Sequence, residues 1–223
     1  GGVEGMSRAP FVMPKADSAF SRSSSVFDTT RGWRFVNSQM KAQYGIDSMP
    51  ETAENVAHDY GVARADQDAI ALRSQQRYSA ARARGFFDDE LVAVNIPGKK
   101  GDTAVTQDEH PRDTTLDALS KLKPVVKPDG SVTAGNASGV NDGAAAMIIA
   151  SEQAVKRFGL TPRARLVGMA TAGVPPRIMG IGPVPSTRKL MERLGLKIGD
   201  FDWIELNEAF ASQGLACLRQ LGL

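Results

Sequence analysis

Two spacings of hydrophobic residues divide the chain near residue 133. Before that point the helical spacing is the clearest pattern. The capping box Ser48-Met-Pro-Glu51 predicts a helix that ends at Gly61, because a serine and a glutamate three residues apart satisfy free N–H groups at a helix start. A second helix is expected over residues 66–84, and a short one over residues 116–122. The apolar face of the second helix is expected to comprise Ala65, Ala69, Leu72, Ala80 and Ala83.

Beyond residue 133, short apolar runs alternate with helical segments. This alternation predicts an α/β fold with a largely parallel sheet. The run at 144–149 is expected to begin as a helix and to continue as a strand. The expected strands cover 147–150, 164–171 and 203–206, after an earlier one at 92–96, and the expected helices cover 151–158, 186–194 and 208–221. Ser151 and Ser186 are the expected N-caps of the first two of these helices.

Residues 8–50 lack a regular pattern. Prolines and polar runs such as Ser21-Arg-Ser-Ser-Ser25 predict an irregular arm rather than helices or strands. The arm is nevertheless rich in aromatic residues, so we expect an anchored loop and not a disordered tail. Its aromatic residues are Phe11, Phe20, Phe27, Trp33, Phe35 and Tyr44.

Nearly every side chain is small in Thr133-Ala-Gly-Asn-Ala-Ser-Gly-Val-Asn-Asp-Gly-Ala-Ala-Ala146, called the small-residue segment below. Gly135 and Gly139 allow a ligand to approach the backbone closely, and the short polar side chains around them can form hydrogen bonds. The segment therefore predicts a cradle for the polar tail of a ligand. A flexible linker is the alternative interpretation.

Composition narrows the class of protein. The 223 residues are 42% hydrophobic, which is enough for a core in one large or two small domains. The net charge of +2 comes from 27 basic and 25 acidic residues spread along the chain, so no nucleic-acid binding is indicated. Neither a long apolar run nor a signal peptide is present, so we expect no membrane contact and a cytoplasmic location. Both ends look cut, which predicts an internal piece of a longer protein.

Few side chains could carry chemistry. Asn207 lies between an expected strand and the last helix, where α/β proteins place their sites, and its neutral amide could stabilise an oxygen that gains charge. An N-cap of that helix is the alternative role. Cys217, the single thiol, has apolar neighbours and is expected to be buried and structural rather than nucleophilic. His58 and His110 are too scattered to predict a metal site, and His58 is a weak catalytic candidate.

Three stretches resemble signature motifs of the thiolase family: Gly1-Gly-Val-Glu-Gly-Met-Ser7, Thr133-Ala-Gly-Asn-Ala-Ser-Gly-Val-Asn-Asp-Gly143 and Asn207-Glu-Ala-Phe210. Residues 27–37 and 47–56 are similar to the branch that acts on 3-oxoadipyl-CoA. The resemblance implies part of a layered α/β/α/β/α thiolase-like fold with an inserted loop domain. Residues 1–7 would end the N-terminal half, residues 8–132 would form the loop domain that covers coenzyme A, and residues 133–223 would begin the C-terminal half.

Thiolases use a nucleophilic cysteine, a second cysteine and a histidine, and the resemblance places all three outside these residues, so the chain alone is expected to be inactive. It also implies that Asn207 holds the water of an oxyanion hole. The other implied contacts are Ala134 and Ser138 with pantetheine, Met49 and Met179 with the acyl and pantetheine pocket, Arg112 near the nucleotide, and Ala209 and Phe210 at the reaction site.

The implied reaction is cleavage of a 3-oxoacyl-CoA by coenzyme A, which is a substrate and not a resident cofactor. The resemblance further implies a homodimer or homotetramer without a metal. Ser48 stands where acetoacetyl-CoA thiolases commonly carry histidine, which favours a different acyl group, and Gly5 replaces a usual serine. A non-catalytic acyl-CoA- or lipid-binding protein and a biosynthetic acetoacetyl-CoA thiolase are the alternatives. Arg31 and Arg34 are candidate partners for an acyl carboxylate, unless both are ordinary solvated arginines.

Overall fold

Helices contribute most of the packed interior. The computed structural model describes residues 1–223. Its α-helices are α1 (Ser38–Tyr44), α2 (Met49–Asp59), α3 (Arg64–Ala83), α4 (Leu116–Ser120), α5 (Glu152–Phe158), α6 (Pro183–Leu194) and α7 (Ala211–Leu221). The 3₁₀ helices are η1 (Met6–Arg8), η2 (Pro176–Ile181) and η3 (Ile198–Asp200). The strands are β1 (Gly2–Glu4), β2 (Phe11–Val12), β3 (Phe27–Asp28), β4 (Val94–Ile96), β5 (Thr103–Val105) and β6 (Gly143–Ala145).

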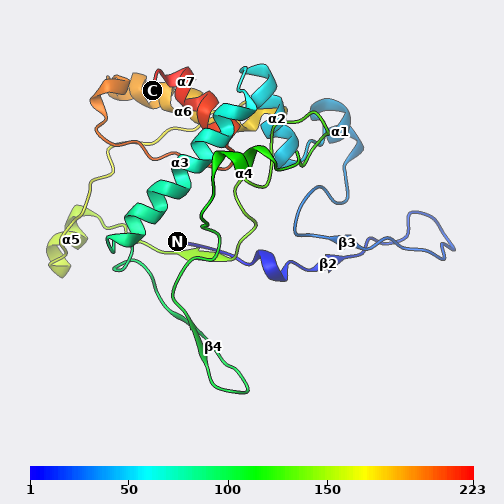
Figure 1. Ribbon diagram of the computed structural model, residues 1–223, viewed down its shortest axis with the longest axis horizontal. Helices are drawn as coiled ribbons and strands as arrows, with labels where there is room; N and C mark the ends of the chain where they lie inside the picture. Colours follow the sequence, from blue (N-terminus) through cyan, green and yellow to red (C-terminus); the bar gives the residue numbers. More distant parts are fainter.

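The main core lies where α2, α7 and η2 meet. Helix α6 packs on α7, and α3 contacts both α4 and α7. Figure 1 shows these helices gathered on one side of the molecule, while the β2–β3 ribbon and the β4–β5 hairpin project away from it. The buried core residues are Val56, Ala57, Val62, Ile181, Val184, Ala216 and Cys217. A smaller buried cluster comprises Ala53, Val132 and Phe210.

Every strand pair is antiparallel: β1 with β6, β2 with β3, and β4 with β5. The prediction of a largely parallel sheet is therefore wrong for the strands that these residues form. The strand predicted at 92–96 is confirmed in part as β4, but it begins at Val94 and is exposed rather than half-buried, and its partner β5 was not predicted. The run at 144–149 does not begin as a helix, because its first residues belong to β6 and pair with β1. Beside this pair, Ser7 N and Oγ donate to the two carboxylate oxygens of Asp142 at 2.8 and 2.5 Å.

Three predicted strands, at 147–150, 164–171 and 203–206, are wrong as assigned strands. No strand of the chain lies beside them to exchange backbone hydrogen bonds, and a strand requires such a neighbour. Their side chains are correspondingly open, with Ile148 87% and Trp203 90% exposed. We call these segments the exposed apolar runs; their large exposed side chains are Met147, Ile148, Ile149, Leu166, Val167, Met169, Trp203 and Ile204.

Most predicted helices are confirmed, with corrections at their starts. Helix α2 begins at the predicted capping box, where Ser48 N donates to Glu51 Oε2 at 2.6 Å. Ser151 caps α5 as expected. Ser186 is not an N-cap, because α6 already begins at Pro183, a residue type favoured at the first helical position since it has no N–H to satisfy. Helix α7 begins at Ala211, three residues later than predicted.

The buried face of α3 differs from the predicted one. Ala65, Ala69 and Ala80 are exposed, whereas Gln67 and Asp68 are buried. The prediction failed because it assigned the most hydrophobic face to the interior. Asp68 has polar partners elsewhere in the chain, as described below, and Gln67 Nε2 donates to Ser131 Oγ at 2.9 Å, whereas Gln67 Oε1 has no hydrogen-bond partner.

The arm at residues 8–50 is less irregular and less anchored than expected. It contains α1, which was not predicted and which Asn37 caps by accepting from Gln39 N and Met40 N at 2.9 and 3.0 Å. Phe20 is fully exposed. Trp33 does anchor the later part, because its Nε1 donates to the Asp47 carbonyl oxygen at 3.2 Å.

Candidate functional site

The small-residue segment is tied to the residues that precede α7. Ala137 forms an antiparallel bridge with Phe210, Ser138 N donates to the Ala209 carbonyl at 2.9 Å, and Ala211 N donates to the Asn136 carbonyl at 2.9 Å. These bonds bring Ser138, Ala209 and Phe210 together, as the thiolase resemblance implies. The linker interpretation is wrong for this part of the segment, because a linker would not be fixed by such pairing.

A buried carboxylate, that of Glu54, holds the residues that lead into the small-residue segment. Glu54 of α2 is 8% exposed, and its oxygens accept from Ser131 N at 2.6 Å, Val132 N at 2.7 Å and Ser131 Oγ at 2.9 Å. Hydrogen bonds to a charged acceptor are stronger than those between neutral groups. Helix α2 therefore fixes the position of residues 131 and 132.

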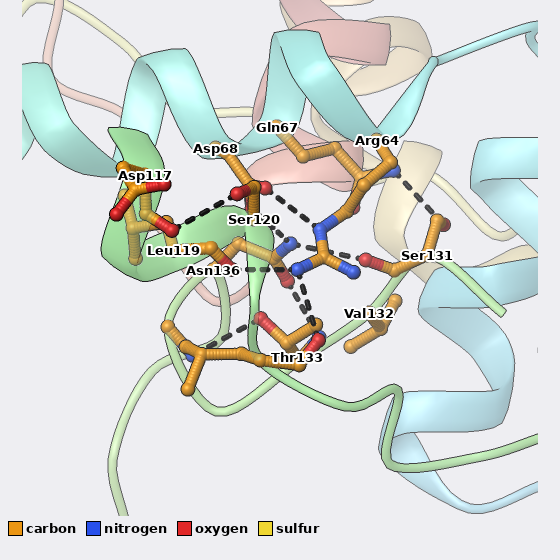
Figure 2. Close-up of polar contacts among 12 residues, drawn as sticks. Arg64, Gln67, Asp68, Asp117, Leu119, Ser120, Ser131, Val132, Thr133 and Asn136 are labelled. Carbon is orange, nitrogen blue, oxygen red and sulfur yellow. Dashed lines mark hydrogen bonds and ion pairs between the residues drawn. The ribbon is translucent and has the colours of Figure 1, made fainter. Parts of the chain in front are cut away.

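A second group of buried polar side chains links the segment to α3 (Figure 2). Asn136 Nδ2 donates to Asp68 Oδ1 at 3.1 Å and to the Ser131 carbonyl at 3.0 Å, while its Oδ1 accepts from Thr133 N at 2.8 Å. Arg64 Nε donates to the other oxygen of Asp68 at 2.8 Å. The same guanidinium donates to the Leu119 carbonyl at 2.7 Å, which ties α4 to the group. Helix α3 thus holds the turn directly through Asn136, and Arg64 links α3 to α4.

A cavity of about 310 Å³, called the α3 cavity, lies between α3 and the small-residue segment. Ser138 and Phe210 line it, opposite Ser74 and Gln75 of α3. Ser74 Oγ donates to Glu208 Oε2 at 2.5 Å. His110, for which the sequence predicted no role, also lines this cavity.

A larger cavity of about 850 Å³, called the arm cavity, lies between the arm, the start of α2 and η2. Met49 and Met179 both line it, so two residues 130 positions apart meet as expected for an acyl pocket. The arm contributes aromatic walls and one cation; these residues are Trp33, Arg34 and Phe35. The two cavities are near neighbours, because Phe210 of the α3 cavity packs with Ala53, the residue after Thr52 of the arm cavity.

Cys217 is fully buried in the main core, which confirms the structural interpretation. Burial raises the pKa of its thiol, and the hydrogen bond from Gln213 opposes that effect in part. A neutral, enclosed thiol is a poor nucleophile. His58 projects into solvent at the end of α2 and contacts only Asp59, at 3.0 Å. No group of His, Cys, Asp or Glu side chains is arranged to hold a metal ion. None of the helices has the length and apolar character to cross a membrane.

Comparison with known protein families agrees with this arrangement. The thiolase N-terminal domain matches residues 1–153, and the thiolase C-terminal domain matches residues 160–223. The chain belongs to the thiolase family.

Similar proteins indicate which branch of the thiolase family the chain resembles most. The chain is 69% identical to the beta-ketoadipyl-CoA thiolase of Pseudomonas putida and 70% identical to that of Pseudomonas aeruginosa. Each alignment covers 100% of this chain and 56% of the relative, so the chain spans about half the length of these thiolases. A crystal structure of Bacillus anthracis acetyl-CoA acetyltransferase is 41% identical, with a TM-score of 0.90 over 100% of this chain and 56% of that one. The expected thiolase-like α/β fold, present in part, is confirmed.

The site residues predicted from the thiolase resemblance fall into two groups and three separate positions. Ser138 and Phe210 line the α3 cavity, Ala209 is bonded to Ser138 through its carbonyl, and Met49 and Met179 both line the arm cavity. Ala134 is exposed in the turn and lines neither cavity. Arg112 is also exposed, and its backbone N donates to Gln75 Oε1 at 3.0 Å beside the α3 cavity.

Asn207 is exposed, and its side chain has no hydrogen-bond partner within the chain. The N-cap interpretation is wrong, because the N-cap of α7 is Phe210, three residues later. The Asn207 amide therefore remains available to another group. Its role in an oxyanion hole stays a prediction, as do the boundaries at residues 7 and 132.

Sequence reasoning missed the buried polar residues Glu54, Gln67 and Asp68. Hydrophobic periodicity places charged residues in solvent, so it cannot detect a carboxylate whose partners are backbone N–H groups far along the chain. The only available signal was the run of small polar residues at 131–138, which requires hydrogen-bond partners from somewhere once it is buried.

Proposed function

We propose that this chain supplies the acyl- and coenzyme A-binding parts of a thiolase that cleaves a 3-oxoacyl-CoA with free coenzyme A. The proposed substrate is 3-oxoadipyl-CoA, which would give acetyl-CoA and succinyl-CoA. The observation that carries the proposal is the 69% identity to a beta-ketoadipyl-CoA thiolase along the whole chain. The 45% identity to an acetyl-CoA acetyltransferase of Syntrophomonas wolfei is lower, which favours the 3-oxoadipyl branch over the acetoacetyl one.

The proposal gives each group of residues a physical role. Ser138 and the neighbouring backbone bind pantetheine, because small side chains let a narrow amide-containing chain lie close to them. Met49 and Met179 enclose the acyl chain with apolar, adaptable surface. Asn207 donates, through a water, to the thioester oxygen as it gains negative charge; a neutral amide can do this at any pH.

Coenzyme A enters this scheme as a substrate, and no resident cofactor or metal is proposed. Assembly into a homodimer or homotetramer stays a prediction, as does a cytoplasmic location. We make these statements for the thiolase as a whole, of which the chain matches about half.

A non-catalytic acyl-CoA-binding role is the second candidate. Cys217 does not decide between the two, since this thiol is buried and neutral and a nucleophilic cysteine is expected outside these residues. A chain without an activated nucleophile can bind a thioester but cannot accept its acyl group. The two candidates differ in whether these residues support turnover when a nucleophilic cysteine is supplied.

A chimaera tests the proposal. The 223 residues replace the matching segment of the Pseudomonas putida thiolase, and thiolysis of 3-oxoadipyl-CoA and acetoacetyl-CoA is measured. We expect thiolysis with a preference for 3-oxoadipyl-CoA, and we expect Asn207→Ala to lower kcat by about a hundredfold, as when one oxyanion donor is removed.

The matched control is Asn95→Ala, which removes an exposed asparagine from the projecting β4 strand and should leave kcat unchanged. A folded chimaera that binds acyl-CoA without turnover would favour the binding role. A preference for acetoacetyl-CoA would favour the biosynthetic branch. Equal kcat values for Asn207→Ala and Asn95→Ala would contradict the assigned role of Asn207.

A further inference from the structure

Arg34 lines the arm cavity and interacts electrostatically with Asp28, but forms no ion pair with it. Arg34 is half-buried, and its guanidinium donates to two main-chain carbonyls, those of Gly32 and, at 2.9 Å, Thr29. It forms none of the ion pairs of the structure. A guanidinium carries five N–H donors, so these two bonds leave donors unused.

Each of the other charged side chains around the cavity has its own hydrogen-bond partner, although the partners of Asp47 and Asp28 are neutral groups. Arg177 Nη1 pairs with Asp59 Oδ2 at 2.5 Å. Asp47 Oδ2 accepts from Asn55 Nδ2 at 2.8 Å. Asp28, in the strand before Arg34, accepts from Thr30 N at 2.8 Å and Thr30 Oγ1 at 2.6 Å. Arg34 is therefore the positive charge that the cavity leaves for a ligand.

The walls around Arg34 are mostly apolar. Trp33 and Phe35 lie on either side of it in the sequence, and Met49 and Met179 line the same cavity. Such a lining suits methylene groups, while a half-buried cation suits an anionic end, because a carboxylate left unpaired in an apolar site is strongly disfavoured. The cavity thus fits a chain that is apolar along its length and ends in a carboxylate. At about 850 Å³ it is within the usual size range of small-molecule sites.

We propose that Arg34 binds the terminal carboxylate of the acyl group and so selects dicarboxylic over simple acyl-CoA substrates. This inference rests on the proposed function. Arginine is suited to the task, since its planar fork can donate two parallel hydrogen bonds to one carboxylate. The bonds to Gly32 and Thr29 hold the fork in place before the ligand arrives, which reduces the entropy lost on binding.

Arg31 provides an internal contrast. It lies three residues earlier in the same arm, and the sequence left both arginines as candidates. Arg31 is exposed and does not line the arm cavity. The structure therefore assigns the role to Arg34 alone, and Arg31 serves as the matched control.

Binding to the 223-residue chain tests the inference without requiring catalysis. Calorimetric titrations compare the dissociation constants of coenzyme A, succinyl-CoA and butyryl-CoA. The last two ligands differ only at the end of the acyl group, where succinyl-CoA carries a carboxylate and butyryl-CoA a methyl group. We expect wild type to bind succinyl-CoA about tenfold more tightly than butyryl-CoA, equivalent to about 1.4 kcal/mol. Arg34→Gln should abolish that preference and retain butyryl-CoA binding, whereas Arg31→Gln should retain the preference.

Each remaining outcome is decisive. Wild type that binds none of the three ligands would overturn the proposed function together with the inference. Wild type that binds succinyl-CoA and butyryl-CoA equally, or Arg34→Gln with an unchanged preference, would overturn the inference alone. Circular dichroism verifies that each variant is folded. If Arg34→Gln does not fold, Arg34→Lys keeps the charge but not the fork, so a folded Arg34→Lys variant should show a weaker preference, and an undiminished preference would also overturn the inference.

Discussion

At the scale of single residues, buried polar groups hold the small-residue segment in place. Glu54 is the clearest case, because both of its oxygens accept hydrogen bonds from residues 131 and 132. Replacing the carboxylate with an amide of the same shape removes one acceptor oxygen. The new NH₂ group then faces the N–H and hydroxyl donors of residues 131 and 132. The cost of leaving a buried N–H unsatisfied is typically about 1–3 kcal/mol.

We therefore expect Glu54→Gln to lower the free energy of unfolding by about 2 kcal/mol. Urea denaturation of the purified chain measures the change. Glu90→Gln is the control, because Glu90 is exposed and forms no hydrogen bond through its side chain. Equal midpoints for the two variants would mean that the Glu54 bonds contribute no net stability.

The sequence could identify several site residues but not what supports them. Met49, Met179, Ser138 and Phe210 were expected from family motifs, and the structure brings them together in two groups. Asp68 and Glu54 were not expected, since their partners are dozens of residues away in the chain. The sequence left Arg31 and Arg34 as equal candidates for binding an acyl carboxylate, because burial and ion pairing cannot be read from a sequence.

At the scale of elements, a charged contact couples α2 to η2, the element that carries Met179. Arg177 donates to Asp59, and this bond, together with a smaller one from His58, holds the pKa of the Asp59 carboxyl below its usual value. A lowered pKa means that the contact stabilises the folded state above the ordinary pKa of 3.8 and that this contribution is lost as pH falls through the lowered value.

Asp59→Asn should consequently reduce stability near neutral pH, and the difference from wild type should shrink as pH falls below 3.8. Urea denaturation between pH 7 and pH 3 follows this difference. Asp129→Asn, at an exposed aspartate that forms no ion pair, should show no such pH-dependent difference. A constant difference between Asp59→Asn and wild type across the pH range would contradict the coupling.

Helices were predicted better than strands for a physical reason. The hydrogen bonds and caps of α2 and α5 come from residues within four positions, so local sequence determines them. The pairing of β1 with β6 joins residues 139 to 143 positions apart, and nothing in either short run specifies its partner. The runs at 147–150 and 164–171 have the composition of strands but no neighbour to pair with.

At the scale of the whole molecule, the exposed apolar runs are the main departure from an ordinary protein surface. Contiguous apolar surface with free backbone N–H and C=O groups promotes association between chains. We expect the purified chain to self-associate at micromolar concentrations, and we expect Ile148→Lys to raise the monomer fraction severalfold by adding charge to one run.

Light scattering during gel filtration measures the monomer fraction. Val92→Lys is the control, because Val92 is 84% exposed but lies outside the exposed apolar runs, so it should have little effect. A wild-type chain that is monomeric at high concentration would contradict the prediction.

The bond between Ser7 and Asp142, next to the β1–β6 pair, means that residues 8–141 leave and re-enter the rest of the molecule at one point. Within that region the arm can be lengthened or shortened without moving the two strands, whereas α2 is fixed because it packs on α7 and η2 in the main core. The entropic cost is small, since each doubling of a flexible loop adds only about 0.6 kcal/mol to its closure. Substrate range could thus diversify in the arm and its cavity through insertions and deletions, while the strands beneath keep their register.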